Sequence, residues 1–356
     1  MNELKDILAG WYETHQRTLP WRSDPSPYFV WLSEIILQQT RVSQGMAYFL
    51  RFTEQWPTLP DLAKATEEEV LKLWQGLGYY SRARNLHKCA QQVMERYGGQ
   101  FPADYEALRR LQGIGPYTAA AIASIAFGLP HAVVDGNVYR VLSRLYDIDT
   151  PINKEEGVKL FAQLAEEFLD RAHPGKHNQA LMEFGALQCL PKNPDCLRCP
   201  IQAHCLALAH HTVEERPQKE KKLKIRTRFF NYLVFFTSGQ EVYLHHRRNK
   251  DIWENLYDFP CIESEKALST EELIRTEDFQ TLTGGQEFLI QRVSPPFTHK
   301  LTHQTIIATF TEIKIQGFLP IIQTKDILLT PKNKMGSLPI PKLIENYLKT
   351  NATWQA

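Results

Sequence analysis

Four of the six cysteines in this chain of 356 residues lie in one short window, Cys189-x6-Cys196-x2-Cys199-x5-Cys205. In a reducing compartment, so many thiols in one compact loop indicate metal or cluster ligation rather than disulfides. Zinc sites more often show paired Cys-x2-Cys units, whereas an iron-sulfur cluster accepts single, unevenly spaced cysteines. The spacing therefore favours an iron-sulfur cluster and leaves zinc as the alternative.

The region before this window has helical periodicity throughout. A capping box at residues 66–69 opens an amphipathic helix, and two nearby glycines end it. Residues 82–97 repeat the amphipathic pattern, and the alanine- and isoleucine-rich residues 117–127 predict a fully buried helix. We therefore expect an all-α domain over residues 1–210.

After residue 228 the pattern changes to that of strands. Because 356 residues exceed what one hydrophobic core usually organises, we expect a second domain here, of α+β class, over residues 229–350. Two strands are expected around a turn at Ser238-Gly239. The expected strands and helices cover residues 229–236, 241–244, 304–315, 270–274 and 341–348.

Charge is distributed unevenly along the chain. The net charge of +1, from 41 basic and 40 acidic residues, argues at first against nucleic acid as a partner. Residues 211–230, however, hold seven basic and three acidic residues, and no Asp or Glu occurs over residues 71–94 or 107–134. We interpret residues 211–228 as a basic linker; a solvated tether without a ligand is the alternative.

The N-terminal segment has no long apolar run, so neither a signal peptide nor a membrane-spanning segment is expected. We accordingly expect a cytoplasmic, nucleoid-associated protein.

A tight turn precedes the alanine-rich segment. Gly113 and Gly115 let the backbone bend and expose N–H groups at the start of a helix, where a phosphate can be held without lysine. Taken alone, such a turn is more often a simple connection between two helices.

Together, the cysteine window and this hairpin resemble the endonuclease III and MutY superfamily of DNA glycosylases. The resemblance implies a helix-hairpin-helix over about residues 105–128 and a 4Fe-4S cluster on Cys189, Cys196, Cys199 and Cys205. In that superfamily the cluster shapes a loop that meets the DNA backbone, so Lys192 and Arg198 would contact phosphates.

Two carboxylates stand out within this frame. Asp135 follows the hairpin at the separation typical of the superfamily's catalytic aspartate, although a helix N-cap is the plain alternative. Glu34 lies in the apolar helical run of residues 31–40, where a structural ion pair would also account for it. Cleavage of a base–sugar bond needs a proton donor and a carboxylate beside the developing cation. Burial would keep Glu34 protonated, whereas a polar cap would keep Asp135 ionised.

Residues 19–22, 31–40 and 76–86 resemble the MutY-type members in particular. Bifunctional relatives carry a nucleophilic lysine two residues after the second hairpin glycine, where this chain has Tyr117, so strand cleavage is expected to be weak or absent. The resemblance implies that Tyr117 and Asn137 support Asp135. It also implies that an adenine pocket is formed by Arg17, Arg22 and Gln179, with Glu183 nearby. Gln39 and Tyr79 would probe the base stack.

The second domain resembles the Nudix-like domain of MutY-type enzymes, which reads 8-oxoguanine. Residues 253–260 match one of its segments, while the pyrophosphatase signature is missing after residue 229, so nucleotide hydrolysis is not expected. The family's Phe-Ser-His loop aligns with Leu301, Thr302 and His303. Thr302 keeps a hydroxyl for the lesion, but Leu301 lacks the aromatic ring.

The resemblance implies a monofunctional adenine DNA glycosylase. Its expected partner is duplex DNA in which adenine faces 8-oxoguanine or guanine, and it is expected to act as a monomer. Two alternatives remain: a glycosylase/lyase acting on oxidised pyrimidines, and a DNA-damage binder without catalysis.

Overall fold

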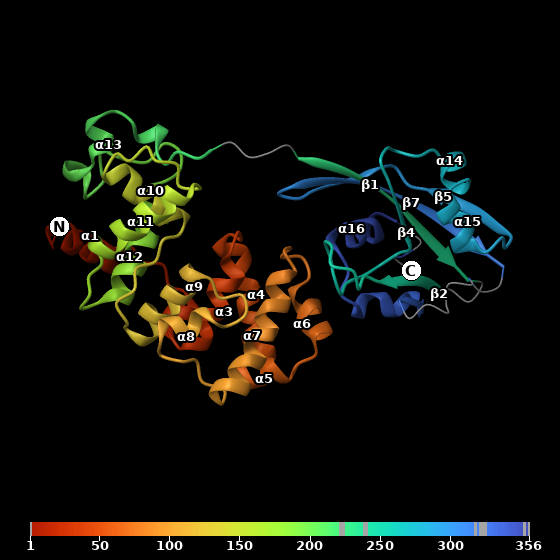
Figure 1. The fold of residues 1–356 in the computed structure, drawn as a ribbon, viewed down its shortest axis with the longest axis horizontal. Coiled ribbons are helices and arrows are strands. Elements are labelled where there is room, and N and C mark those ends of the chain that lie inside the picture. The colour runs from red at the N-terminus through yellow and green to blue at the C-terminus, as the bar shows by residue number, and fades with distance from the viewer. Residues whose placement is uncertain are drawn as a thin grey trace. The chain divides into compact units, whose positions relative to one another are not determined.

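The computed structural model describes residues 2–220, 225–237, 241–316, 319, 326–351 and 354 (Figure 1). The chain divides into two compact units. The first comprises Met1–Lys64 and Asn85–Lys222, and the second comprises Ala65–Arg84 and Leu223–Ala356. A short segment from the middle of the helical sequence thus packs with the C-terminal residues, which the sequence pattern did not indicate.

The first unit is helical, as predicted. Its core lies where α12 packs against α10 and α1, and the largest fully buried side chains there are Phe161, Phe168 and Phe184. The helices of this unit in chain order, with α7 continuing into it from the second unit, are α1 (Asn2–His15), α2 (Pro20–Ser23), α3 (Pro27–Leu37), α4 (Val42–Gln55), α5 (Leu59–Lys64), α7 (Ser81–Tyr97), α8 (Tyr105–Arg109), α9 (Pro116–Ala121), η1 (Ile122–Ala126), α10 (Gly136–Leu145), α11 (Glu155–Phe168), α12 (Pro174–Leu187), η2 (Gln202–His204), α13 (Leu206–Ala209) and η3 (Val213–Glu215).

The alanine-rich helix differs from its prediction. It begins as α9 but continues as the π-helix η1, and its last residues are half-buried rather than fully buried. Helix α12 approaches this turn closely, because a Cβ on Gly175 would lie 2.6 Å from the Ser124 carbonyl oxygen. The Asn178 side chain also donates to the Ser124 hydroxyl, at 2.8 Å. A π-turn of this kind often marks a functional site.

The helix that carries Glu34 is shorter than predicted. Ser26 caps α3 by accepting a hydrogen bond from the Phe29 N–H, and the helix ends at Leu37 rather than continuing through residue 40. Gln39 adopts a left-handed conformation with φ of 57°, which an α-helix does not accommodate. Residues 38–40 therefore form a turn at the C-terminal end of α3.

The second unit is built on a mixed sheet. Strands β1 (Arg226–Phe236) and β7 (Gln304–Ile315) pair in parallel, in register from Arg226 opposite Gln304 to Phe236 opposite Lys314. The strand order is β3-β2-β1-β7-β5, while β4, β6 and β8 pair with β1, β7 and β2 respectively. The remaining strands are β2 (Glu241–His246), β3 (Tyr257–Asp258), β4 (Cys261–Ser264), β5 (Phe288–Val293), β6 (Phe297–Lys300) and β8 (Ile327–Pro331).

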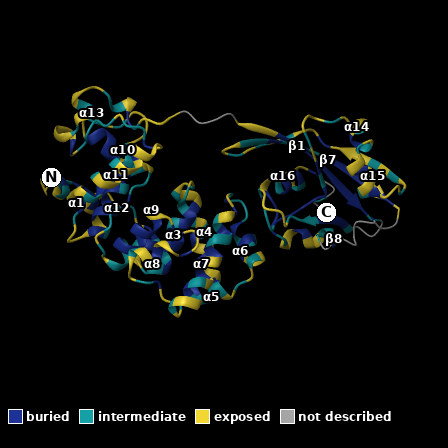
Figure 2. Ribbon diagram, viewed as in Figure 1, coloured by how far each residue is buried: buried dark blue, intermediate teal, exposed yellow. Residues whose placement is uncertain are grey.

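The strand predictions at residues 229–236, 241–244 and 304–315 are confirmed, and β1 begins three residues earlier, at Arg226. The turn predicted at Ser238-Gly239 lies outside the described residues. Figure 2 shows β7 largely buried, in keeping with its place inside the sheet. The helices of this unit are α6 (Glu67–Trp74), α14 (Thr270–Ile274), α15 (Glu277–Thr283), η5 (Lys332–Ser337) and α16 (Lys342–Thr350). Three of them were predicted: α6 from its capping box, and α14 and α16 at residues 270–274 and 341–348.

Helix α6 forms as its sequence predicts. Thr66 accepts from the Glu69 N–H while the Glu69 carboxylate accepts from the Thr66 N–H, which completes a capping box. Gly76 and Gly78 follow the helix with φ of 98° and 74°, a conformation that favours glycine. Over the described part of the chain, no helix combines the length and apolar character needed to cross a bilayer.

Candidate active site

A cavity of about 490 Å³ opens in the helical unit and brings the two predicted carboxylates together. Glu34 reaches it from α3, and Asp135 reaches it from the N-terminus of α10. The two carboxylates therefore come from helices α3 and α10, which lie far apart in the sequence. The other predicted residues that line it are Arg17, Arg22, Gln39, Tyr117, Asn137, Gln179 and Glu183.

Glu34 is held in a state from which it can give or take a proton near neutral pH. Burial raises its pKa from 4.5 to about 7, while a hydrogen bond of 2.5 Å from the Tyr117 hydroxyl opposes that rise. The negative charge of Asp135 raises the pKa further. This agrees with the prediction that burial favours the protonated form of Glu34.

Asp135 is the N-cap of α10, as its alternative interpretation required, and it also faces the cavity. Its Oδ1 accepts from the N–H groups of Asn137 and Val138 at 2.9 and 2.8 Å, and its Oδ2 accepts from the Asn137 side chain at 2.7 Å. Burial raises the pKa of Asp135, and these hydrogen bonds oppose the rise. The sequence predicted only the influence of the polar cap, because the depth of burial depends on packing between helices.

Three charged side chains that line the cavity form a cluster of ion pairs. Glu183 accepts from the Arg17 guanidinium at 2.8 and 2.5 Å and from the Arg22 guanidinium at 2.9 Å at each oxygen. Burial opposes ionisation of Glu183, but the two arginines hold its pKa at about 2. Gln179 accepts a 2.7 Å hydrogen bond from the Tyr12 hydroxyl. These contacts fix the side chains, and their binding of adenine stays a prediction.

The predicted hairpin joins α8 to α9 and is exposed at its tip. Gly113 has φ of 76°, and a Cβ there would lie 2.8 Å from the Asn85 Cβ, so both backbone conformation and space require glycine. Gly115 is the N-cap of α9, and a Cβ there would meet no atom within 4 Å. The hairpin therefore presents open space at the start of α9.

Comparison with known proteins identifies the family. Residues 32–167 match the HhH-GPD superfamily of base excision DNA repair proteins, and residues 231–350 match the NUDIX domain. The adenine DNA glycosylase of Buchnera aphidicola subsp. Baizongia pistaciae is 34% identical over 302 residues, which cover 84% of this chain and 82% of that protein. The adenine DNA glycosylase of Buchnera aphidicola subsp. Acyrthosiphon pisum is 31% identical over 353 residues, which cover 96% and 97%.

The chain belongs to the adenine DNA glycosylase family.

A solved structure supports the fold of the helical part. The structure of a thermostable thymine-DNA glycosylase matches with a TM-score of 0.55 and 28% identity, covering 59% of this chain and 96% of that one. The predicted resemblance and the two-part fold, a helix-hairpin-helix region followed by a Nudix-like region, are confirmed.

In this member of the adenine DNA glycosylase family, the four cysteines of the predicted cluster loop line one small cavity and form no disulfide. Arg144 donates to Cys189 Sγ at 3.4 Å. Burial raises the pKa of Cys199 to about 12, which a bound metal would reverse. No three His, Cys, Asp or Glu side chains among the described residues are grouped closely enough to hold a metal ion. Four thiols around one cavity are the donor type that an iron-sulfur cluster requires, and the cluster itself stays a prediction.

Arg140 was not predicted from the sequence. Its guanidinium donates to the Cys189 and Gly185 carbonyl oxygens at 2.7 and 2.6 Å and to the Asn137 side-chain oxygen at 2.8 Å. A buried arginine thus connects the partner of Asp135 with the first cysteine of the loop. Its position one helical turn after Asn137 was the available signal, but an arginine at that spacing on a helix is usually exposed.

Three more of the predicted residues, Tyr79, Thr302 and His303, lie in the second unit. Thr302 and His303 are exposed in a tight turn between β6 and β7, closed by a hydrogen bond of 2.8 Å from the Leu301 N–H to the Gln304 carbonyl oxygen. Tyr79 is exposed with a left-handed backbone, and its hydroxyl contacts the Thr302 hydroxyl. The unit therefore brings one predicted probe of the base stack beside the predicted lesion-recognition loop.

Proposed function

We propose that this protein removes adenine from duplex DNA in which adenine is mispaired with 8-oxoguanine or guanine, without cleaving the strand. Membership in the adenine DNA glycosylase family supports the class of reaction. The observation that carries the mechanism is that two carboxyls with different partners face one cavity, and that one of them has a pKa of about 7.

Glu34 acts as the general acid. It protonates N7 of an adenine that has been flipped into the cavity, so that the electron pair of the breaking base–sugar bond leaves with a neutral base. The resulting Glu34 carboxylate then takes a proton from the water that attacks the sugar. The Tyr117 hydroxyl stabilises this carboxylate by hydrogen bonding.

Asp135 faces the sugar cation that develops as the base departs. Its carboxylate stabilises that cation by charge or by forming a transient covalent adduct at the same carbon. The three hydrogen bonds from Asn137 and Val138 fix its orientation and favour its ionised form.

Strand cleavage would require an amine that attacks the sugar carbon. Tyr117 occupies the position at which bifunctional relatives carry lysine, and no lysine is found among the described residues that line the cavity. We therefore expect the product to be an abasic site in an intact strand.

Two further roles belong to this proposal. The four loop cysteines hold a 4Fe-4S cluster that shapes a DNA-binding loop, with Lys192 and Arg198 at phosphates. The exposed hydroxyl of Thr302 contacts 8-oxoguanine in the opposite strand. Iron and sulfide analysis with the visible absorption spectrum tests the first role, since zinc gives no visible band.

The decisive experiment is a single-turnover assay on duplexes in which adenine faces 8-oxoguanine, guanine, cytosine or thymine, scored for strand breaks before and after alkali. Breaks that need alkali, on the first two duplexes, are the expected result. Glu34→Gln should slow release about a thousandfold, whereas Glu54→Gln, an exposed glutamate on α4, should not. Breaks without alkali, or rapid release by Glu34→Gln, would overturn the proposal.

A further inference from the structure

The segment Ala65–Arg84 and the C-terminal residues form one compact unit, although the family match assigns this segment to the helical part. Its second half carries Tyr79, which contacts Thr302. What holds the segment in this unit therefore decides whether Tyr79 and Thr302 stay together. The contacts that do so come from two stretches of the C-terminal residues.

The first stretch is the loop before β3. The Arg84 guanidinium donates to the Glu254 carbonyl oxygen at 2.8 Å and to the Glu254 carboxylate at 2.7 Å. The Asn255 side chain donates to Glu67 at 2.5 Å, and the Tyr257 hydroxyl donates to Glu68 at 2.9 Å. The Arg84 and Glu254 side chains are 13% and 26% exposed, so their ion pair is only weakly screened by solvent.

The second stretch is residues 338–340. The Lys72 ammonium and the Tyr80 hydroxyl donate to the Leu338 and Ile340 carbonyl oxygens at 3.0 and 3.4 Å. The Tyr257 N–H donates to the Pro339 carbonyl oxygen at 2.9 Å, which joins the two stretches to each other. These contacts use backbone acceptors. The contacts between pairs of side chains, which depend on the identity of both residues, therefore lie in the first stretch.

The loop that carries Glu254 is also held by contacts that do not involve Arg84. Trp253 and Asn255, on either side of Glu254, both have φ of 62°, a conformation that non-glycine residues adopt only when their surroundings hold them. The Arg247 backbone supports it, since its N–H donates to the Leu256 carbonyl oxygen at 3.0 Å and its carbonyl oxygen accepts from the Asn255 N–H at 2.6 Å.

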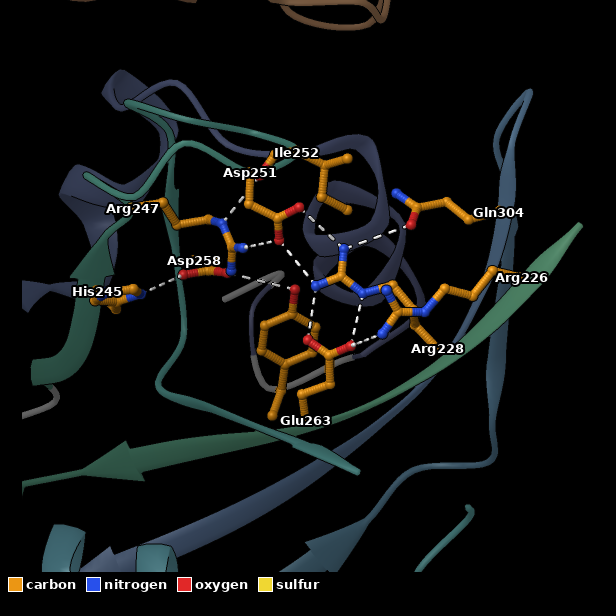
Figure 3. Close-up of polar contacts among 10 residues, drawn as sticks. Arg226, Arg228, His245, Arg247, Asp251, Ile252, Asp258, Glu263 and Gln304 are labelled. Carbon is orange, nitrogen blue, oxygen red and sulfur yellow. Dashed lines mark hydrogen bonds and ion pairs between the residues drawn. The ribbon is translucent and has the colours of Figure 1, made fainter. Parts of the chain in front are cut away.

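Figure 3 shows the charged network that includes the Arg247 side chain. Arg247 contacts Asp258 and Asp251, at 2.8 and 3.3 Å, and Arg228 bridges Asp251 and Glu263, with one nitrogen 2.8 and 2.6 Å from their respective carboxylates. Carboxylates and guanidiniums thus alternate from β4 to the base of the loop. This network supports the loop from which Glu254 contacts Arg84.

The same loop also reaches the strand that leads into the lesion-recognition turn. The Trp253 ring lies 5.6 Å from the His299 ring on β6, centroid to centroid. One loop therefore contacts both the segment with Tyr79 and the strand that leads to Thr302.

We propose that Glu254 is a positioning residue for discrimination of the base opposite adenine. Its ion pair with Arg84 holds Tyr79 beside Thr302, so that the stack probe and the lesion-reading hydroxyl meet the opposite base together. This inference rests on the proposed function, because it concerns the choice between 8-oxoguanine and guanine.

The experiment compares single-turnover rates of the full-length protein on duplexes with adenine opposite 8-oxoguanine and opposite guanine. Glu254→Ala should lower the ratio of the two rates about tenfold, a typical coupling for a close charged pair. The charge-swapped variant R84E/E254R should restore part of the ratio. Glu265→Ala, an exposed glutamate in the same unit, is the matched control and should leave it unchanged.

Thermal unfolding of each variant separates positioning from a merely structural role. An unchanged ratio in Glu254→Ala, an equal fall of both rates, or a charge swap that restores nothing would overturn the inference. A wild-type protein that releases adenine from neither duplex would instead overturn the proposed function, and the inference with it.

Discussion

The Tyr117 hydroxyl and Glu34 Oε2 lie 2.5 Å apart and share a hydrogen bond across the cavity between α9 and α3. In the mechanism proposed above, this hydrogen bond lets Tyr117 stabilise the carboxylate form of Glu34.

Tyr117→Phe should move the pH dependence of adenine release to higher pH. The hydrogen bond from Tyr117 lowers the pKa of Glu34, so its loss lets burial raise that pKa further above about 7. Glu34 would then stay protonated at more alkaline pH, although the Glu34 carboxylate formed after proton transfer would be less well stabilised. The single-turnover rate measured across pH 5 to 9 checks this; an alkaline limb at the wild-type position would contradict it.

Glu34→Gln should stabilise the protein at alkaline pH. The pKa of Glu34 is 4.5 in its ordinary state and about 7 in the folded protein, so folding favours the protonated form. Stability from this group is full below pH 4.5 and is lost as pH rises through 7, by about 3 kcal/mol. Denaturant unfolding at pH 5 and pH 8 measures this. The free energy of unfolding of the variant should rise relative to that of the wild type only at pH 8. Equal stability at both values would argue against a buried acid.

Glu183→Gln should destabilise the helical unit by about 2 kcal/mol at pH 7, because it leaves Arg17 and Arg22 without their carboxylate. The pKa of Glu183 is held at about 2, below its ordinary 4.5. Its contribution is therefore present above pH 4.5 and is lost as pH falls toward 2.

Urea unfolding of Glu183→Gln and wild type should accordingly differ at pH 7, and the difference should narrow at pH 3, because the Glu183 contribution is then partly lost. Glu13→Gln is the matched control, since Glu13 pairs with Lys176 at an exposed position. If both variants lose the same free energy of unfolding, the partly buried ion pairs of Glu183 contribute no more stability than an exposed pair.

Gly113→Ala and Gly115→Ala should separate folding from DNA binding. At Gly113, a positive φ and a close Asn85 side chain should make alanine cost about 2 kcal/mol of stability. At Gly115 the backbone is ordinary and the space is open, so stability should change little. A methyl group there would occupy the space in which we expect a phosphate, so DNA affinity should fall. Thermal unfolding and fluorescence anisotropy check the pair; unchanged affinity in Gly115→Ala would contradict a phosphate at this hairpin.

Local patterns predicted most of the elements because their causes are local. The capping box of α6, the glycines that end it and the periodicity of α7 depend on residues a few positions apart. The same holds for β1 and β7, whose apolar runs predict buried strands wherever the strands pair. The end of α3 at Leu37 and the π-turn η1 were not predicted, because the first depends on the left-handed Gln39 and the second on packing against α12.

The sequence by itself determined the family and the helical and mixed parts, and it singled out Glu34 and Asp135 as candidates, since motif spacing and helix caps depend on neighbouring residues. Only the tertiary structure decided that these two carboxyls share one cavity, that Arg140 connects Asn137 with Cys189, and that the segment with Tyr79 packs with the C-terminal residues. Such relationships depend on contacts between residues tens to hundreds of positions apart. Burial and pKa follow from those contacts, so no local pattern could specify them.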